Sequence, residues 1–287
     1  MKYPASELVL NNKGQVYHLG LSPEQIAENV ILVGDQDRVN LVSQFFEKIE
    51  HQSQHREFVC HTGTYKGKRI SVLSTGIGTD NLDIAINELD ALVNIDLEKR
   101  EDNAQFTSLN LVRIGTCGIL QAHIPVHSYI LSTHAYGLDN IAHFYPADFT
   151  EEEKKLNDLL DSYLQLPEKI KPYFVSASEE LINKLNSEKT FKGITVTSSG
   201  FYAPQGRSLR LGLASENLNE NLALFNYNGL KVNNFEMESS ALFFLGKNLG
   251  HKVCTICLGI ANRPNREFSK GYSKEMNELI QYVLERI

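Results

Sequence analysis

The stretch LNLVRIGTCG, residues 109–118, begins as an apolar strand and ends in a glycine-containing turn. Apolar segments of strand length recur along the chain with helical patterns between them, which is typical of an α/β sheet. The segments are 30–33, 70–73, 109–114, 129–131, 194–196 and 253–260. Because no repeat, low-complexity tract or linker interrupts this alternation, residues 1–287 are predicted to form a single α/β domain.

The helical pattern is clearest over residues 82–93, where the apolar side chains form one stripe and Asp80 or Asn81 is a candidate cap. Further helices are predicted over 151–164, 179–185, 236–249 and 274–287. The charged segment DLEKREDNAQFT, residues 96–107, is expected to be an exposed excursion, either helical or loose. It is also a candidate contact for a partner subunit.

Composition narrows the class of protein. With 42% hydrophobic residues and a formal net charge of −7, the chain is predicted to be a soluble globular protein without the basic surface that nucleic-acid binding requires. No apolar run approaches the roughly 20 residues of a membrane helix, and the start MKYPASELVLNNKG lacks a signal-peptide pattern. Four cysteines are too few for a disulfide framework, so the expected compartment is the cytoplasm.

The cysteines leave two questions of chemistry. Cys254 and Cys257 have the spacing of half a zinc site or a redox pair, but both fall in an apolar strand pattern, and His251 is the one further ligand nearby. They are predicted to be buried structural thiols, and no metal is expected. Cys117 is predicted to be a packing residue, although a reactive thiol in its turn would make the protein sensitive to alkylation.

Three turns follow apolar strands, namely VGDQDR at 33–38, STGIGTDN at 74–81 and RIGTCG at 113–118. Loops at the carboxyl ends of strands in an α/β sheet meet over one crevice, where glycines let backbone N–H groups approach an anion. Arg38 and Arg113 would converge on one ligand there, and the hydroxyls available to it are those of Ser74, Thr75 and Thr116. Each turn alone is equally compatible with an ordinary strand end that carries a surface arginine.

The motif FEMESS, residues 235–240, leads into an apolar helix pattern. One carboxylate at the start of a helix can accept the two hydroxyl hydrogens of a ribose diol, while helix capping is the competing interpretation. Glu236 and Glu238 are two positions apart and would not share a helix face. They are therefore not expected to act as an acid/base pair.

The loop FYAPQGR, residues 201–207, offers a different set of polar groups. The Gln205 amide presents a donor and an acceptor, and Arg207 adds a fork of donors, which together match the polar edge of uracil. Phe201 could stack on the face of such a base. An ordinary surface loop with a proline turn fits the same residues.

Taken in order, these motifs resemble the nucleoside phosphorylase-I family, and within it the branch that acts on uridine. The matching stretches are YHLGL at 17–21, VGDQDRV at 33–39, REF at 56–58, STGIG at 74–78, IAINEL at 84–89, VRIGTCG at 112–118, FYAPQGR at 201–207, FEMES at 235–239 and ANR at 261–263. The resemblance implies a three-layer α/β/α fold with a mixed, barrel-like central sheet. It also implies a homo-oligomer, dimer or hexamer, with active sites shared between paired subunits.

The resemblance further assigns roles to individual residues. It places phosphate on Gly34, Arg38, Arg113 and Thr116, with Arg56 supplied by the neighbouring subunit. It places the ribose on Met237 and Glu238, with His18 of the neighbour, and the base on Phe201, Gln205, Arg207 and Arg263. The catalytic roles fall to Arg38, Arg113, Glu238 and Arg207.

The implied activity is reversible phosphorolysis of uridine to uracil and ribose 1-phosphate through an oxocarbenium-like transition state. Inorganic phosphate is then a co-substrate, and no cofactor or metal is required. Where the purine branch has an acid that protonates the base, this chain has Asn262 and Arg263, which disfavours purines. A purine nucleoside phosphorylase, a nucleosidase that uses water, and a catalytically silent nucleoside-binding protein are the alternatives.

Two departures from the family pattern affect the phosphate-binding turns. Gln36 stands where the family usually has proline, and Thr79 and Asp80 replace smaller residues. Both put the fine geometry of these turns in question while leaving Gly34 and Arg38 in place. The preference between uridine and deoxyuridine or thymidine is left open.

Overall fold

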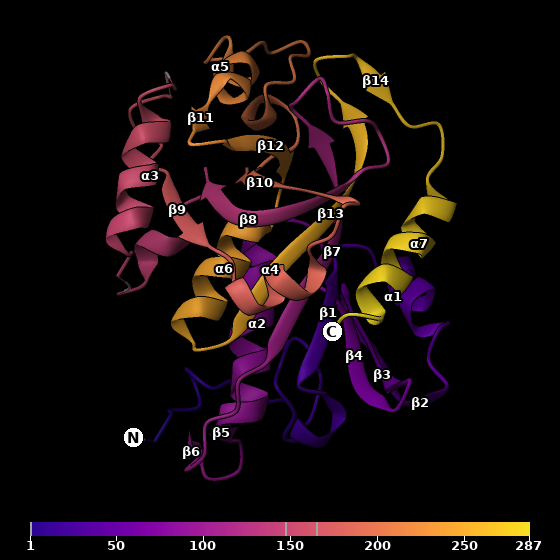
Figure 1. Ribbon diagram of the computed structural model, residues 1–287. Coiled ribbons are helices and arrows are strands. Elements are labelled where there is room, and N and C mark those ends of the chain that lie inside the picture. The colour runs from indigo at the N-terminus through magenta and orange to yellow at the C-terminus, as the bar shows by residue number, and fades with distance from the viewer. Residues whose placement is uncertain (1, 147, 165) are drawn as a thin grey trace.

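The structure is a computed structural model that describes residues 2–146, 148–164 and 166–287, and its centre is a closed barrel of five strands (Figure 1). The row β12-β10-β8-β13-β7 returns on itself because β12 also pairs with β7, through Asn234 to Ile119 and Phe235 to Gly118. The pairing of β13 is parallel with β7 and antiparallel with β8, so the barrel is mixed, as predicted. The barrel strands are β7 (Asn110–Ile119), β8 (Tyr129–Gly137), β10 (Thr190–Thr197), β12 (Leu230–Glu236) and β13 (Lys252–Asn262).

The sheet continues past β7 as an open, twisted extension. Its strands are β1 (Asn29–Val33), β4 (Lys68–Ser74), β3 (Phe58–Tyr65) and β2 (Lys48–His55), in that spatial order. Residues 30–33 are fully apolar and fully buried, because helices cover both faces of the sheet at β1. Short strands pair at the margins of the sheet, and these are β9 (Tyr173–Ser176), β11 (Asn226–Tyr227) and β14 (Glu267–Phe268).

Helices form the two outer layers, which confirms the predicted three-layer α/β/α arrangement (Figure 1). On one face α2 (Thr79–Asn94) packs with α6 (Ser239–Asn248), where Leu89 and Leu242 belong to the same buried cluster. On the other face lie α1 (Gln36–Ser43), α4 (Glu179–Leu185) and α7 (Ser273–Leu284), which share a second cluster with Val39 and Ile280. Two further helices, α3 (Glu151–Asp161) and α5 (Leu218–Leu224), cover a third cluster beside the barrel.

Several details of the predicted helices are wrong, and α3 and α7 each end three residues before the predicted end. The helix expected over 236–249 begins at Ser239, because Glu236 is the last residue of β12. The cap of α2 is Gly78 rather than Asp80 or Asn81. Its φ of 99° and ψ of 164° lie in a region that glycine alone occupies without strain, so the geometry of the turn decides the cap.

The segment 96–107 is an exposed excursion, as predicted, and is not a helix. Its first part forms a small antiparallel hairpin, β5 (Ile95–Asp96) with β6 (Glu101–Asp102), and residues 103–107 have no regular secondary structure. The Asp96 carboxylate accepts hydrogen bonds from the backbone N–H groups of Glu98 and Lys99, which stabilises the turn between the strands. Within the described ranges, no helix has the length and hydropathy needed to cross a membrane.

Candidate active site

A cavity of about 780 Å³ opens where the carboxyl ends of β1, β4 and β7 meet the mouth of the barrel. These three strands are parallel, so the turns that follow them necessarily lie at one edge of the sheet. The structure brings most of the predicted site residues into the wall of this cavity. They are Gly34, Arg38, Arg113, Thr116, Phe201, Gln205, Arg207, Met237 and Glu238.

One end of the cavity is a cationic corner made by Gly34, Arg38 and Thr116. Arg38 lies in the first turn of α1, and its Nη1 donates to the carbonyl of Ile114 at 3.5 Å. Burial and then the neighbouring positive charge of Arg113 lower the pKa of Arg38. An anion bound between the two guanidinium groups would relieve their repulsion, so this corner is suited to phosphate.

Two of the hydroxyl groups predicted to help bind an anion are used elsewhere. The Ser74 hydroxyl donates to the carbonyl of Glu57 at 2.6 Å and accepts from the N–H of Val59. The Thr75 hydroxyl donates to the carbonyl of Gly76 at 3.0 Å. Both side chains are buried and satisfy backbone groups within the fold, so of the three predicted hydroxyls the one in the cavity wall is that of Thr116.

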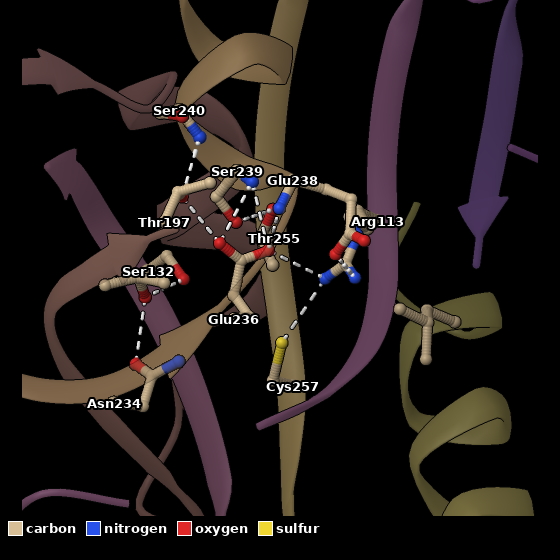
Figure 2. Close-up of polar contacts among 12 residues, drawn as sticks. Arg113, Ser132, Thr197, Asn234, Glu236, Glu238, Ser239, Ser240, Thr255 and Cys257 are labelled. Atoms are coloured by element: carbon tan, nitrogen blue, oxygen red, sulfur yellow. Dashed lines mark hydrogen bonds and ion pairs between the residues drawn. The ribbon is translucent and has the colours of Figure 1, made fainter. Parts of the chain in front are cut away.

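The centre of the cavity wall is a buried cluster of one guanidinium and two carboxylates (Figure 2). Arg113 pairs through Nη1 with Glu236 at 3.2 Å and through Nη2 with Glu238. Glu238 also accepts the backbone N–H of Gly78, the cap of α2, at 2.8 Å. Arg113, which the sequence predicts to converge with Arg38 on one anion, therefore also has two carboxylates as partners.

The charges of this cluster perturb one another strongly. Burial disfavours the charged form of Arg113, yet Glu238 and Glu236 hold its pKa above the ordinary value. Burial raises the pKa of Glu238, the charge of Arg113 opposes that shift, and Glu236 adds to it. The cluster thus carries one excess negative charge when both carboxylates are ionised, beside the position assigned to the sugar.

Glu236 lines the cavity, although the sequence did not assign it to the site. Glu236 and Glu238 were expected not to act together because both were placed on one helix, whereas Glu236 ends β12 and Glu238 caps α6. Their side chains therefore converge on Arg113. The signal was present in the FEMES motif, but a strand that runs through Glu236 and a helix that starts after it would have had to be predicted.

The other end of the cavity carries the loop residues Phe201, Gln205 and Arg207. Gln205 is almost fully buried, and its Oε1 accepts a hydrogen bond from Arg207 Nη1. The Arg207 guanidinium also lies 3.8 Å from the centre of the Phe201 ring. Burial and the charge of Arg263 lower the pKa of Arg207 to about 10, and Arg263 itself donates to the carbonyl of Gly206 behind the cavity wall.

His18 and Arg56 lie outside this cavity, on an exposed surface that we call the Tyr17 patch, made of Tyr17, His18 and Arg56. The Arg56 guanidinium lies 5.6 Å from the centre of the Tyr17 ring, and the Tyr17 and His18 rings meet edge to face at 5.0 Å. The His18 ring is oriented by Glu88, which lies 2.6 Å from Nδ1. The two residues that the family resemblance assigns to a neighbouring subunit thus share one surface.

The departure at Gln36 has a local structural role. Gln36 is the first residue of α1, and its side-chain amide donates to the carbonyl of Arg56 at 2.8 Å. Arg56 has a φ of 55°, which places it in the left-handed region. The turn predicted to bind phosphate is therefore linked to the turn that carries Arg56.

The cysteines are buried free thiols, as the apolar strand pattern indicated. Cys117 lines the cavity but is only 4% exposed, and burial raises its pKa well above the ordinary value. Cys257 accepts a long contact of 3.6 Å from Arg113 Nη1. Because thiolates rather than thiols are nucleophiles, Cys117 is a packing residue of the cavity wall.

The cavity has a cationic corner, a central carboxylate and a polar end, and it lies at the mouth of a closed mixed barrel. This is the layout of a pentosyltransferase. The chain belongs to the family described as the Phosphorylase superfamily, whose sequence model matches residues 28–287. This match confirms the predicted family and, with the relatives below, the predicted class of nucleoside phosphorylase.

The relatives include two curated enzymes and one solved structure. A uridine phosphorylase of Thermococcus kodakarensis is 30% identical over 277 residues, which cover 96% of this chain and 87% of that protein. A DeoD-type purine nucleoside phosphorylase of Brevibacillus brevis is 30% identical over 246 residues, or 83% of either chain. A crystal structure of a Trypanosoma brucei nucleoside phosphorylase with uridine phosphorylase activity is 27% identical, has a TM-score of 0.90, and covers 98% of this chain and 99% of that chain.

Proposed function

We propose that the chain is a uridine phosphorylase, which converts uridine and inorganic phosphate reversibly to uracil and ribose 1-phosphate. The observation that carries the proposal is the Gln205–Arg207 hydrogen bond at the wall of a cavity that also holds Arg38 and Glu238. Similarity to uridine phosphorylases over nearly the whole chain supports the same substrate.

The hydrogen bond from Arg207 fixes which way the Gln205 amide faces. With Arg207 on one side of Oε1, the remaining lone pair can accept the N3–H of uracil, and Nε2 can donate to the adjacent carbonyl. Arg207 supplies a further donor for the second carbonyl. This donor and acceptor order matches the polar edge of uracil, and the exposed Phe201 ring offers a stacking surface.

The proposed reaction follows from where charge develops. As the glycosidic bond lengthens, the sugar becomes cationic and the departing uracil gains negative charge. Phosphate held at Arg38 and Thr116 stabilises the cation and attacks C1′, while Glu238 holds the ribose hydroxyls next to Met237. Arg207 and Gln205 stabilise the uracil anion, and an oriented donor of this kind is worth about 3 kcal/mol in the transition state.

No cofactor or metal enters the proposed mechanism, because charged side chains and phosphate itself supply all of the stabilisation that it requires. Phosphate is the nucleophile, so no covalent enzyme intermediate forms. Inorganic phosphate is consumed as a co-substrate in the forward reaction and regenerated in the reverse reaction.

The proposed active enzyme is a homo-oligomer in which paired subunits complete one another's sites. The support is the location of His18 and Arg56 on one exposed patch rather than in their own cavity. Glu88 orients the His18 ring through Nδ1, which leaves Nε2 as the acceptor for a 5′-hydroxyl of the neighbouring site. Arg56 would add a cation to the neighbour's phosphate.

A purine nucleoside phosphorylase is the second candidate, since a DeoD-type relative is equally identical over a shorter stretch. Against it stands Asn262, which lies where the purine branch carries an acid. The Asn262 side chain is fully buried and donates to the carbonyls of Gln121 at 3.1 Å and Ile124 at 2.8 Å. Its polar atoms are committed to the fold, and so it is unsuited to protonating a base.

The proposal is tested by incubating the purified protein with uridine, thymidine, inosine and adenosine, with and without phosphate. Phosphate-dependent release of uracil from uridine is the expected result. Cleavage of inosine without cleavage of uridine would contradict the assignment of the base. Release of uracil at an equal rate without phosphate would instead identify a nucleosidase.

A further inference from the structure

The carboxylate of Glu236 has its acceptor positions filled by the protein itself (Figure 2). A carboxylate offers about four acceptor sites. The donors to Glu236 are the Thr197 hydroxyl at 2.6 Å, the backbone N–H of Glu238 at 2.9 Å, the backbone N–H of Ser239 at 3.0 Å, and Arg113 Nη1 at 3.2 Å. Glu236 lines the cavity but has no capacity left for a substrate hydroxyl.

Glu238 is in a different situation, although it is equally buried. One of its oxygens accepts the N–H of Gly78 and the other pairs with Arg113 Nη2. These two donors fill about half of the sites of a carboxylate, so both oxygens keep capacity for the two hydroxyls of a vicinal diol. Of the two carboxylates, Glu238 is therefore the one able to hold the ribose.

The two carboxylates are mechanically linked. Arg113 joins them through its two terminal nitrogens, so the direction of the Glu238 carboxylate depends on where Glu236 holds Arg113. Glu236 also binds the backbone N–H groups of Glu238 and Ser239, which are the cap and first residue of α6. A change at Glu236 would release both the side-chain partner and the backbone of Glu238.

We propose that Glu236 is a positioning residue for the proposed phosphorolysis: it holds Arg113 and the start of α6 in place and thereby aims Glu238 at the sugar, without contacting substrate. This inference rests on the proposed function. Its consequence is that Glu236 contributes mainly to the transition state, because hydrogen bonds to the sugar hydroxyls strengthen as the ring becomes cationic.

The charge of Glu236 gives the proposal a second readout. Arg113 from β7, Glu236 from β12 and the Gly78 N–H at the start of α2 all face the Glu238 carboxylate. Burial raises the pKa of Glu238, Arg113 opposes this, and Glu236 raises it further. Activity that needs ionised Glu238 is lost as the pH falls through this pKa, so removing the charge of Glu236 should move the acid limb of kcat/KM to lower pH.

The test compares Glu236→Gln with Glu153→Gln in the full-length protein. Glu153 is a matched control because its buried carboxylate also accepts two backbone N–H groups, from Thr150 and Ser176, and pairs with a cation, Lys247. It does not line the cavity. For Glu236→Gln we expect kcat/KM for uridine to fall about 100-fold, mostly in kcat, as displaced catalytic groups do.

Two further measurements separate positioning from mere destabilisation. If Glu238 holds the diol, the wild-type enzyme should prefer uridine to 2′-deoxyuridine. This preference should shrink in Glu236→Gln, and the acid limb should shift as described. Glu153→Gln should lower the melting temperature and leave both quantities unchanged. The proposal would be overturned if Glu236→Gln kept the wild-type preference for uridine over 2′-deoxyuridine and its acid limb of kcat/KM did not shift.

If Glu236→Gln does not fold, Thr197→Val and Thr197→Ser provide the same comparison with a smaller change. The Thr197 hydroxyl donates to Glu236 and accepts the N–H of Ser240, and serine keeps both bonds. Valine should lower kcat about 10-fold and serine should restore it. Equal kcat in the two variants would contradict the proposal, whereas a wild-type protein without uridine cleavage would contradict the proposed function instead.

Discussion

At the scale of single residues, neighbours decide what each polar side chain of the cavity can do. Arg38 donates to one backbone carbonyl and lies beside a second guanidinium, while Arg113 is committed to two carboxylates. Arginines that look equivalent in the sequence therefore differ in their partners. Arg38 has no carboxylate partner among the described residues, and Arg113 joins two carboxylates at the centre of the cavity wall.

The clearest prediction for one side chain concerns Arg207. Replacing Arg207 with Ala removes the donor that orients Gln205 and stabilises the uracil anion, so kcat/KM for uridine should fall about 100-fold to 1,000-fold. The free energy of unfolding should change little, because Arg207 lies in a half-buried loop. Steady-state kinetics and chemical denaturation measure the two effects.

Arg210→Ala is the matched control for this change, since Arg210 is an exposed arginine of the same loop region. It should retain wild-type kinetics. Similar losses of activity in the two variants would indicate that the loop is an ordinary surface segment.

Cys117 leads to a prediction about chemical modification. Its thiol is 4% exposed, and burial raises its pKa, so iodoacetamide at pH 8 should inactivate the native protein slowly. Wild type and Cys117→Ser should lose activity at the same rate. Fast inactivation of the wild type that Cys117→Ser abolishes would show that this thiol is reactive.

At the scale of elements, the start of α2 joins the turns proposed to bind phosphate to Glu238, the carboxylate proposed to bind ribose. Gly78 caps α2 with a φ of 99°, and its N–H donates to Glu238 at 2.8 Å. A helix N-terminus carries partial positive charge, which suits a carboxylate partner. The position of α2 and the direction of Glu238 therefore depend on each other.

Gly78→Ala tests this link. A Cβ at Gly78 meets no atom within 4 Å, so the cost comes from the backbone conformation, about 1–3 kcal/mol. The expected result is lower stability together with weaker binding of uridine, measured as a raised KM.

Gly67→Ala is the control, because Gly67 also has a positive φ, of 75°, and open space around it, in the turn between β3 and β4. It should lose stability without a change in KM. An unchanged KM in Gly78→Ala would mean that the hydrogen bond to Glu238 has no part in binding.

At the scale of the whole molecule, the proposed shared site divides between two places on one subunit. Its cavity holds Arg38, Glu238 and Arg207, while its Tyr17 patch displays His18 and Arg56 at the surface. A twofold-symmetric pair in which each patch faces the other cavity would complete both sites. Gln36 joins the two halves within one chain through its bond to Arg56.

Subunit mixing tests the shared site. Arg38→Ala disables a subunit's own cavity, and Arg56→Ala disables the site of its neighbour. Each variant alone should be nearly inactive. When the two variants are mixed in equal amounts, dissociated and reassociated, the mixture should recover about a quarter of wild-type activity. Random pairing of the subunits leaves that share of the sites intact.

Size-exclusion chromatography first has to show that mixed oligomers form. If these oligomers recover no activity, the shared site is contradicted. High activity of Arg56→Ala by itself would show that Arg56 does not contribute to the neighbouring site.

The sequence by itself determined the elements with strong local signals and the family. The apolar runs at 30–33 and 253–260 are strands, and 179–185 is a helix with the predicted bounds, because burial on both faces and a helical stripe leave unambiguous patterns. The motifs around Arg38, Glu238 and Arg207 also pointed to one nucleoside-binding cavity, since turns after parallel strands must meet at one edge of the sheet.

Only the tertiary structure decided which side chains are partners. The closure of β12 onto β7 places Glu236 next to Arg113. The Ser74 hydroxyl bonds to backbone at the start of β3, and the Thr75 hydroxyl bonds to the carbonyl of Gly76 in the turn after β4. The physical reason is that a buried polar atom must bond to whichever group the packing brings near it, and for Arg113 that group comes from residues more than 100 positions away. Local sequence patterns contain no record of such distant neighbours.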